Sequence, residues 1–167
     1  FCYNELIKDI GQDIKAIKRW AMELQIINHK SKWLGAVQNL GDASSGTVGF
    51  LAREVYSDYA RKGHILVATD GKQLLAYTMF RFKNTGIVIV HLCVDPKHRG
   101  EGIPSKMVDW LIDQNREYIS HIQLACRRDY NLDKFWQKLG FSAVAEKAGR
   151  AVNERTILTI WVRENPG

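Results

Sequence analysis

The stretch of sequence that decides the fold is HLCVDPKHRGEGIPSKMVDWLI, residues His91 to Ile112. It begins as an apolar run typical of a buried strand, passes through a basic, glycine-containing loop, and ends with apolar residues at helical spacing. Glycines before a helix let successive backbone N–H groups point at an anion, and the helix N-terminus adds partial positive charge. Lys97 and Arg99 add full charges. The stretch therefore predicts an anion-binding turn, with a merely tight basic turn as the alternative.

Three apolar runs, separated by two turn sequences, lead up to this stretch, and the third run overlaps its start. Asp70-Gly71 is a dipeptide that favours a hairpin, and Lys83-Asn84-Thr85-Gly86 supplies the next turn. The chain is therefore expected to form a meander with strands over His64–Thr69, Gln73–Phe82 and Ile87–Val94.

Further upstream, the sequence predicts a strand and then two helices. Met22–Asn28 alternates apolar and polar residues, which is typical of a strand. Helices are expected over Ser31–Leu40, with Ser31 as the N-cap, and over Phe50–Lys62. The small residues of Gly41–Gly49 between them predict a loop.

Downstream, helices and strands alternate. Ile103–Ile119 has apolar residues on one helical face, Tyr118 among them, and therefore predicts a helix. The remaining expected elements are a strand over Ile122–Cys126, a helix over Asn131–Leu139, and strands over Phe141–Lys147 and Arg155–Arg163. This order of elements predicts a mixed α/β sheet.

The composition is that of an ordinary globular domain: 167 residues, 46% hydrophobic and 25% charged. No apolar run approaches the roughly 20 residues that a membrane span needs, so a transmembrane protein is not expected. Cys2, Cys93 and Cys126 are widely spaced, so we expect neither a disulfide framework nor a metal site, and a reducing, cytoplasmic location. The net charge of +6 favours an anionic partner: a phosphorylated cofactor, nucleic acid or an acidic surface.

Val94 to Ser105 resembles the coenzyme A signature of the GNAT superfamily of N-acetyltransferases, in which Q/R-x-x-G-x-G/A follows a strand ending in V-D-P. The run RGEGIP, from Arg99, matches the first and fourth signature positions. FWQKLGF, from Phe135, is similar to the F-Y-x-K-x-G-F close of the family's last helix. The resemblance spans Ala21 to Val162 and implies a mostly antiparallel sheet of about seven strands flanked by helices, with an extra N-terminal helix.

The resemblance implies an enzyme that moves an acetyl group from acetyl-CoA directly to a primary amine of a small molecule or peptide, without an acyl-enzyme. In the family, the pantetheine arm lies along the fourth strand, the pyrophosphate meets backbone N–H groups of the glycine loop, and an asparagine after the fifth strand often contacts the cofactor. The cofactor-binding residues implied here are Leu92, Cys93, Val94, Arg99, Gly100, Glu101, Gly102, Ile103, Ser105 and Asn131.

Two residues depart from the family pattern. Pro104 replaces the last small residue of the signature, and proline has no N–H to offer a phosphate. Trp136 stands where many members have the tyrosine that protonates the departing thiolate, and an indole N–H is no acid at neutral pH. We therefore expect weaker cofactor binding, and either another acid or a thiolate that takes its proton from water.

The catalytic candidates are titratable side chains near the cofactor strand. His91 is the titratable group on that strand and is either the base that deprotonates the amine or a core histidine on the far face of the sheet. Tyr130 either replaces the missing tyrosine as the acid or packs on the core at a helix start. Glu54 could act through water, but a solvated surface position explains it better.

Two other functions compete with the enzyme. Pro104 and Trp136 favour a degenerate module that binds coenzyme A, or nothing, and serves in sensing or interaction. The net charge of +6 favours a nucleic-acid-associated domain, but the interleaved exposed aromatics of a single-strand binder are missing.

The first residues fall outside the expected domain. Residues 1–20 carry an apolar stripe at helical spacing and are expected to be a linker or docking helix, whereas 21–167 form the acetyl-CoA-binding domain. The run from Val48 to Arg150 resembles acetyltransferase domains that follow a PIN-type nuclease domain, which implies an upstream domain in a longer chain. Homodimerisation stays open.

Overall fold

The computed structural model describes residues 21–150 and 156–167. In chain order its elements are β1 (Glu23–Ile26), α2 (Leu34–Ala43), α3 (Ser45–Val48), α4 (Arg53–Arg61), β2 (Ile65–Thr69), β3 (Leu74–Lys83), β4 (Gly86–Val94), the 3₁₀ turn η1 (Pro96–His98), α5 (Ile103–Asn115), β5 (His121–Arg127), the 3₁₀ turn η2 (Arg128–Tyr130), α6 (Asp133–Lys138), β6 (Ser142–Ala148) and β7 (Ile157–Glu164). The helix expected within residues 1–20 lies outside the described residues.

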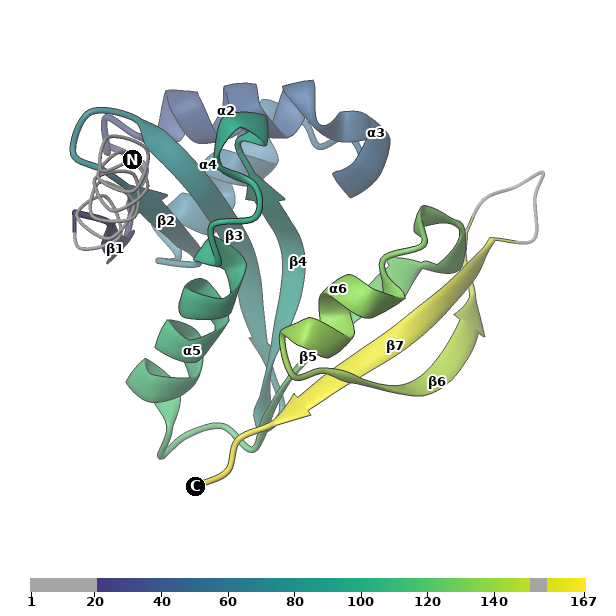
Figure 1. The fold of residues 1–167 in the computed structure, drawn as a ribbon. Helices are drawn as coiled ribbons and strands as arrows, with labels where there is room; N and C mark the ends of the chain where they lie inside the picture. Colours follow the sequence, from purple (N-terminus) through teal and green to yellow (C-terminus); the bar gives the residue numbers. More distant parts are fainter. Residues whose placement is uncertain (1–20, 151–155) are drawn as a thin grey trace, which may run out of the picture.

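The strands form one seven-stranded sheet in the order β1-β2-β3-β4-β5-β7-β6 (Figure 1). Every neighbouring pair is antiparallel except β4 and β5, which run parallel. The predicted mixed, mostly antiparallel sheet is therefore confirmed. No helix of the described residues is long and apolar enough to cross a membrane.

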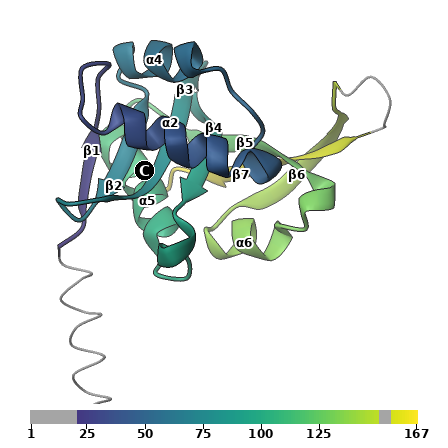
Figure 2. The ribbon, with the colours of Figure 1, turned by 90° about the horizontal axis from the view of Figure 1, so that it is seen from above.

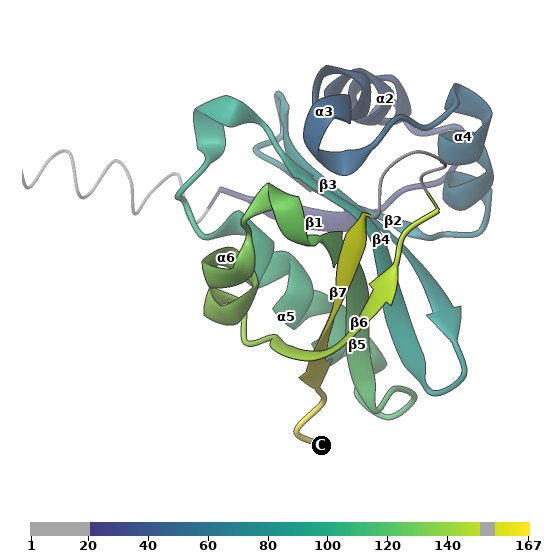
Figure 3. The same ribbon diagram turned by 90° about the vertical axis from the view of Figure 1, so that its right-hand side faces the viewer.

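Helices cover both faces of the sheet. Figures 2 and 3 show α2, α3 and α4 on one side and α5 and α6 on the other. The core is accordingly divided into two clusters, and β2 shows why: Leu66 and Ala68 face α5, whereas Ile65 and Val67 face α2 and α4. Because β2 is buried on both faces, it reads in the sequence as a continuous apolar run.

The hairpin between β2 and β3 forms as its turn sequence predicts. Gly71 adopts a positive φ of +85°, and the Asp70 carboxylate accepts hydrogen bonds from the N–H groups of Lys72 and Gln73 at 2.9 and 2.8 Å. The turn residues thus satisfy their own backbone donors, which explains why a local sequence signal was sufficient here.

The expected loop over Gly41–Gly49 is wrong, because α2 continues to Ala43 and α3 follows it directly. Gly41 is buried inside α2, and a Cβ atom there would overlap the hydroxyl oxygen of Tyr56 and lie 2.7 Å from that of Tyr77. The glycine therefore allows two tyrosines to approach a helix, rather than allowing the chain to turn.

Several helix boundaries also differ from the prediction, those of α2 and α5 among them. α2 begins at Leu34 rather than Ser31, although the Ser31 hydroxyl does accept a hydrogen bond from the Trp33 N–H at 3.2 Å. α5 ends at Asn115 rather than Ile119, and the Tyr118 side chain, expected on its apolar face, is 77% exposed.

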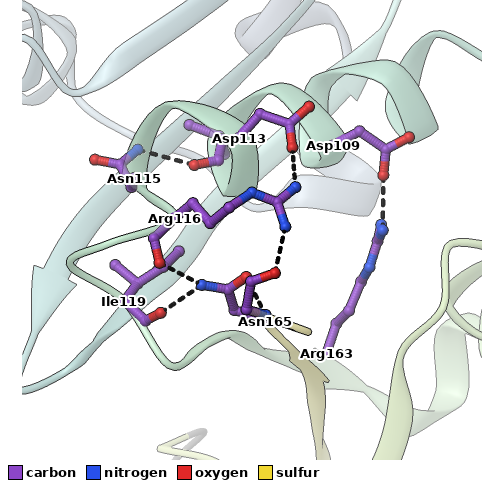
Figure 4. Close-up of polar contacts among 9 residues, drawn as sticks. Asp109, Asp113, Asn115, Arg116, Ile119, Arg163 and Asn165 are labelled. Carbon is purple, nitrogen blue, oxygen red and sulfur yellow. Dashed lines mark hydrogen bonds and ion pairs between the residues drawn. The ribbon is translucent and has the colours of Figure 1, made fainter.

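The end of α5 is held by the C-terminal segment of the described chain (Figure 4). The Asn165 side-chain amide donates to the carbonyl oxygens of Arg116 and Ile119, each at 2.7 Å. Arg163 on β7 pairs with Asp109 of α5 at 2.7 Å. The Asn165 bonds satisfy carbonyl groups at and just beyond the C-cap of α5, and the Arg163–Asp109 ion pair connects α5 to β7.

Candidate active site

The sheet opens between β4 and β5. The two strands pair only through Gly86–Val88 and His121–Gln123, after which β4 continues to Val94 and β5 to Arg127 without a shared register (Figure 1). β3 and β7 occupy their outer edges, so the facing edges are bare strand edges inside a sheet. Such an edge offers backbone donors and acceptors to an extended ligand, which can add as one more strand.

A β-bulge helps to explain the divergence of β4. Met79 of β3 pairs with His91 and the next residue, Phe80, pairs with Ile89, which leaves Val90 unpaired. A bulge bends its strand and raises the local twist. It also moves His91 to the face that α2 and α4 cover, whereas simple alternation from Ile89 would direct it towards α5.

The glycine loop lies directly beyond the C-terminal end of β4. Gly100 and Gly102 have positive φ angles of +77° and +75°, and Gly102 is the N-cap of α5. Within the described part of the chain, a set of backbone N–H groups here donates to no acceptor, namely those of Arg99, Gly100, Glu101, Gly102, Ile103 and Ser105. Free donors at the start of a helix of this length form a site suited to phosphate.

Pro104 is the second residue of α5, between two of these donors. Its missing N–H interrupts the row between Ile103 and Ser105, and its ring fits the first turn of a helix. Lys97 and Arg99 are exposed on the same loop, so they can add positive charge without a burial cost. The loop therefore keeps its anion-binding character despite the proline.

The β4 residues expected to bind the cofactor lie in the half of the strand that does not pair with β5. Leu92 and Val94 pack on the α5 side, and Cys93 packs on the α2 side with its sulfur 3.9 Å from the carbonyl oxygen of Leu40. Burial raises the pKa of the Cys93 thiol, against a smaller opposing effect of Ser44. The thiol is therefore protonated at neutral pH and suits a packing role.

His91 is 5% exposed and lies beside two buried tyrosines, Tyr77 and Tyr56. Its Nδ1 atom lies 3.2 Å from the Tyr77 hydroxyl, and the Tyr56 ring lies edge-on at 6.3 Å between centroids. Burial lowers the pKa of His91, while a hydrogen bond with the Val48 backbone opposes this shift. His91 is therefore a neutral imidazole at pH 7, held between β3 and α3.

The other predicted residues follow β5. Tyr130 ends η2, half-buried, with the guanidinium carbon of Arg127 5.0 Å from the centre of its ring. Asn131 is exposed and has a left-handed backbone with φ of +53°; its side-chain amide donates to the Asp129 carbonyl at 3.2 Å. His91 therefore lies on β4 and Tyr130 on the turn that follows β5, so they flank the opening from its two sides, and Asn131 shapes the turn into α6.

Trp136 lies on α6 with its indole N–H buried and without a hydrogen-bond acceptor among the described residues. Burial raises the pKa of the nearby Cys126 thiol on β5, and the Trp136 indole has a smaller opposite effect. Glu54 is exposed in the first turn of α4, as a solvated side chain would be.

Tyr56 and Tyr77 lie next to the candidate base His91, and sequence reasoning missed them. Both rings are fully buried under α2, and Tyr77 contacts the candidate base. Tyr77 lies inside a continuous apolar strand, where it is indistinguishable from a core aromatic. The signal that could have found them is Gly41, a small residue on a helix face that packs against something large.

A parallel strand pair that opens towards a glycine loop is an arrangement that suits an extended, phosphate-bearing ligand. Residues 44–153 match the family described as the acetyltransferase (GNAT) domain. The chain belongs to this family of acetyltransferases, which identifies acetyl-CoA as the cofactor. No curated protein matches the chain.

Solved structures share the fold at low sequence identity. Ard1 from Thermoplasma volcanium is 20% identical with a TM-score of 0.70, covering 84% of this chain and 96% of that one. NAA60 from Arabidopsis thaliana, solved with a bisubstrate analogue, is 13% identical with a TM-score of 0.72, covering 87% and 99%. The protein yncA from Salmonella typhimurium, solved with its cofactor acetyl-CoA, is 14% identical with a TM-score of 0.69, covering 87% and 95%.

Proposed function

We propose that this protein transfers the acetyl group of acetyl-CoA directly to a primary amine in a ternary complex. One observation carries the proposal: the bare edges of β4 and β5 lead straight into the free N–H groups of the loop before α5. An extended pantetheine chain needs the first feature and a pyrophosphate needs the second. Both lie next to each other along one continuous piece of chain, β4 to α5.

Each cofactor-binding residue then has a distinct task. Leu92, Cys93 and Val94 offer backbone groups to the amides of pantetheine. The backbone N–H groups from Arg99 to Ile103, with that of Ser105, hold the pyrophosphate. Asn131 sits at the turn that faces the cofactor from the β5 side.

The transfer requires one proton to leave and one to arrive. The amine nitrogen must lose a proton as it bonds to the thioester carbon, and the sulfur takes up a proton, or leaves as a thiolate, as the C–S bond breaks. His91 is neutral and can accept the first proton, directly or through water. Tyr130, at the β5 side of the opening, is the proposed donor of the second.

Calorimetric titration with acetyl-CoA and with coenzyme A tests the cofactor site, and thiol release with a panel of small amines and peptides tests transfer. We expect binding and turnover with one acceptor class. Gly102→Val should weaken binding at least tenfold, because its φ of +75° excludes a β-branched residue. Gly63→Val, strained at a similar φ of +70° outside the site, is the matched control and should bind normally.

Other outcomes point to the rival functions. Absence of binding at millimolar cofactor excludes both the enzyme and the cofactor sensor. Binding without turnover favours the cofactor sensor. Two features support that alternative: the Trp136 indole N–H is buried without a hydrogen-bond acceptor among the described residues, and Pro104 has no N–H to offer a phosphate. Salt-sensitive binding of nucleic acid that acetyl-CoA does not displace supports a nucleic-acid-associated domain.

A further inference from the structure

The anion-binding loop contains a carboxylate. Glu101 lies between Gly100 and Gly102, in the middle of the row of free N–H groups. A negative charge at this position repels phosphate. The loop therefore suits a pyrophosphate only if the Glu101 carboxylate is directed away from it.

A chain of side-chain contacts draws this carboxylate towards the β2–β3 hairpin. The Glu101 Oε2 atom lies 3.3 Å from Nδ1 of His98, and Nε2 of His98 lies 3.3 Å from the Gln73 side-chain nitrogen. The same nitrogen donates to the Asp70 carboxylate at 3.2 Å. A hairpin residue and a loop residue 25 positions apart are thereby connected.

The donor and acceptor chemistry of these side chains fixes the direction of each of these hydrogen bonds. The Gln73 amide nitrogen can only donate, so Nε2 of His98 must be the acceptor. The ring proton then resides on Nδ1, where it is donated to Glu101. At the far end, backbone N–H groups fix the Asp70 carboxylate and hold the pKa of that carboxyl below its usual value.

The rest of the loop is tied to the same part of the sheet. The Asp95 N–H donates to the Leu75 carbonyl at 2.8 Å, and the Asp95 carboxylate accepts from the Lys97 N–H at 2.9 Å. The His98 N–H donates to the Asp95 carbonyl at 2.9 Å. The His98 ring is therefore fixed at its backbone as well as at both nitrogens, with its side chain 17% exposed.

We propose that the β2–β3 hairpin, acting through Gln73 and His98, holds the Glu101 carboxylate away from the free N–H groups and so sets the affinity of the loop for the phosphates of coenzyme A. The inference rests on the proposed cofactor site. His98 and Gln73 are positioning residues in this arrangement, and neither needs to touch the cofactor. Glu101 is the group whose placement they control.

Titration of coenzyme A into the parent protein and its variants tests the proposal. His98→Ala and Gln73→Ala should each raise the Kd about fivefold, the effect of one lost hydrogen bond. Glu101→Gln in the His98→Ala background should restore the parent Kd, because no carboxylate is then left to repel phosphate. His29→Ala, an exposed histidine outside the loop, is the control and should leave the Kd unchanged.

Two conservative variants separate the two nitrogens of His98. His98→Asn keeps a donor near the Nδ1 position and should bind nearly as well as the parent. His98→Gln keeps an acceptor near the Nε2 position but loses the donor, and should resemble His98→Ala. Equal Kd values for both variants would contradict an orienting role, since a merely structural histidine would not distinguish them.

The failure of this inference and the failure of the proposed function are distinguishable. A parent protein that does not bind coenzyme A overturns both. A parent that binds, with His98→Ala and Gln73→Ala binding equally well, overturns only the positioning role. Thermal unfolding of each variant identifies one that has lost its fold, and Gln73, exposed on a hairpin, gives a variant that preserves the core.

Discussion

The half of the sheet built from β1 to β4 and the half built from β5 to β7 are packed very differently. In the first half, β2 is buried along its whole length and β3 along most of it. In the second half, every residue of β6 is exposed, and the β6–β7 hairpin extends away from the body of the protein (Figures 1 and 2). One half is a two-sided core, and the other is a thinner arm.

The difference explains where the site lies. The halves are joined at one end only, through Gly86–Val88 and His121–Gln123, so the opposite ends of β4 and β5 are free to diverge. The glycine loop before α5 belongs to the well-packed half, which anchors it through Asp95. Rigid placement of free donors needs a firm support, whereas the arm contributes Tyr130 and Asn131 from turns.

The largest expected effect comes from the packing of the first half. Gly41→Ala should destabilise the protein by about 3 kcal/mol, because the added methyl group would overlap the buried hydroxyl of Tyr56 and crowd that of Tyr77. Chemical denaturation followed by tryptophan fluorescence measures the change in the free energy of unfolding.

Gly35→Ala on the same helix is the matched control. Gly35 is exposed, and its Cβ would meet nothing within 4 Å. This variant should gain about 0.5–1 kcal/mol from helix propensity. Equal changes in the free energy of unfolding for Gly41→Ala and Gly35→Ala would contradict the view that the packing of Tyr56 and Tyr77 requires a glycine at position 41.

Gly41 also shows where sequence reasoning stops. The meander was predictable because its turns are local, as the Asp70 hydrogen bonds show. The helix through Gly41 was not, because the reason for the glycine is a tyrosine 15 positions later in the chain. A glycine chosen for tertiary packing and a glycine chosen for a turn look alike in a sequence.

The candidate site divides in the same way. The loop from Arg99 to Ser105 could be predicted because strand, glycines and helix are contiguous. The contacts of His91 with Tyr77 and of His98 with Gln73 join residues 14 and 25 positions apart. The bulge at Val90 also interrupts the alternation of side chains between the two faces of β4, and the sequence alone does not predict a bulge there.

The junction between the halves is the target of a second, smaller perturbation. Gly86→Ala should cost about 1–2 kcal/mol, because the new Cβ would lie 2.6 Å from Nε2 of His121 on the paired strand. His121 is a half-exposed ring and can partly move aside. Denaturation of the single and double variants measures the coupling.

Adding His121→Ala should relieve the cost of Gly86→Ala, so the two substitutions should be clearly non-additive. Strict additivity would indicate that the methyl group is accommodated elsewhere. Because this contact belongs to the only paired segment of β4 and β5, Gly86→Ala should also weaken coenzyme A binding, whereas the double variant should recover it.

The smallest effect concerns pH and depends on burial in the first half. Burial lowers the pKa of His91 in the folded protein, so above its unfolded value of 6.5 both states are neutral and nothing changes. Below pH 6.5 the unfolded chain takes up a proton that the folded protein resists, so stability falls as pH falls. Burial and Lys62 act in the same direction on His64.

Unfolding free energies at pH 7, 6 and 5 measure this dependence. The parent should lose stability as the pH falls from 7 to 5, because both histidines resist the proton that the unfolded chain takes up. His91→Asn should make this loss smaller, whatever it does to stability at pH 7. His64→Gln should also make the loss smaller. A parent whose stability is flat from pH 7 to 5 would contradict the lowered pKa of His91.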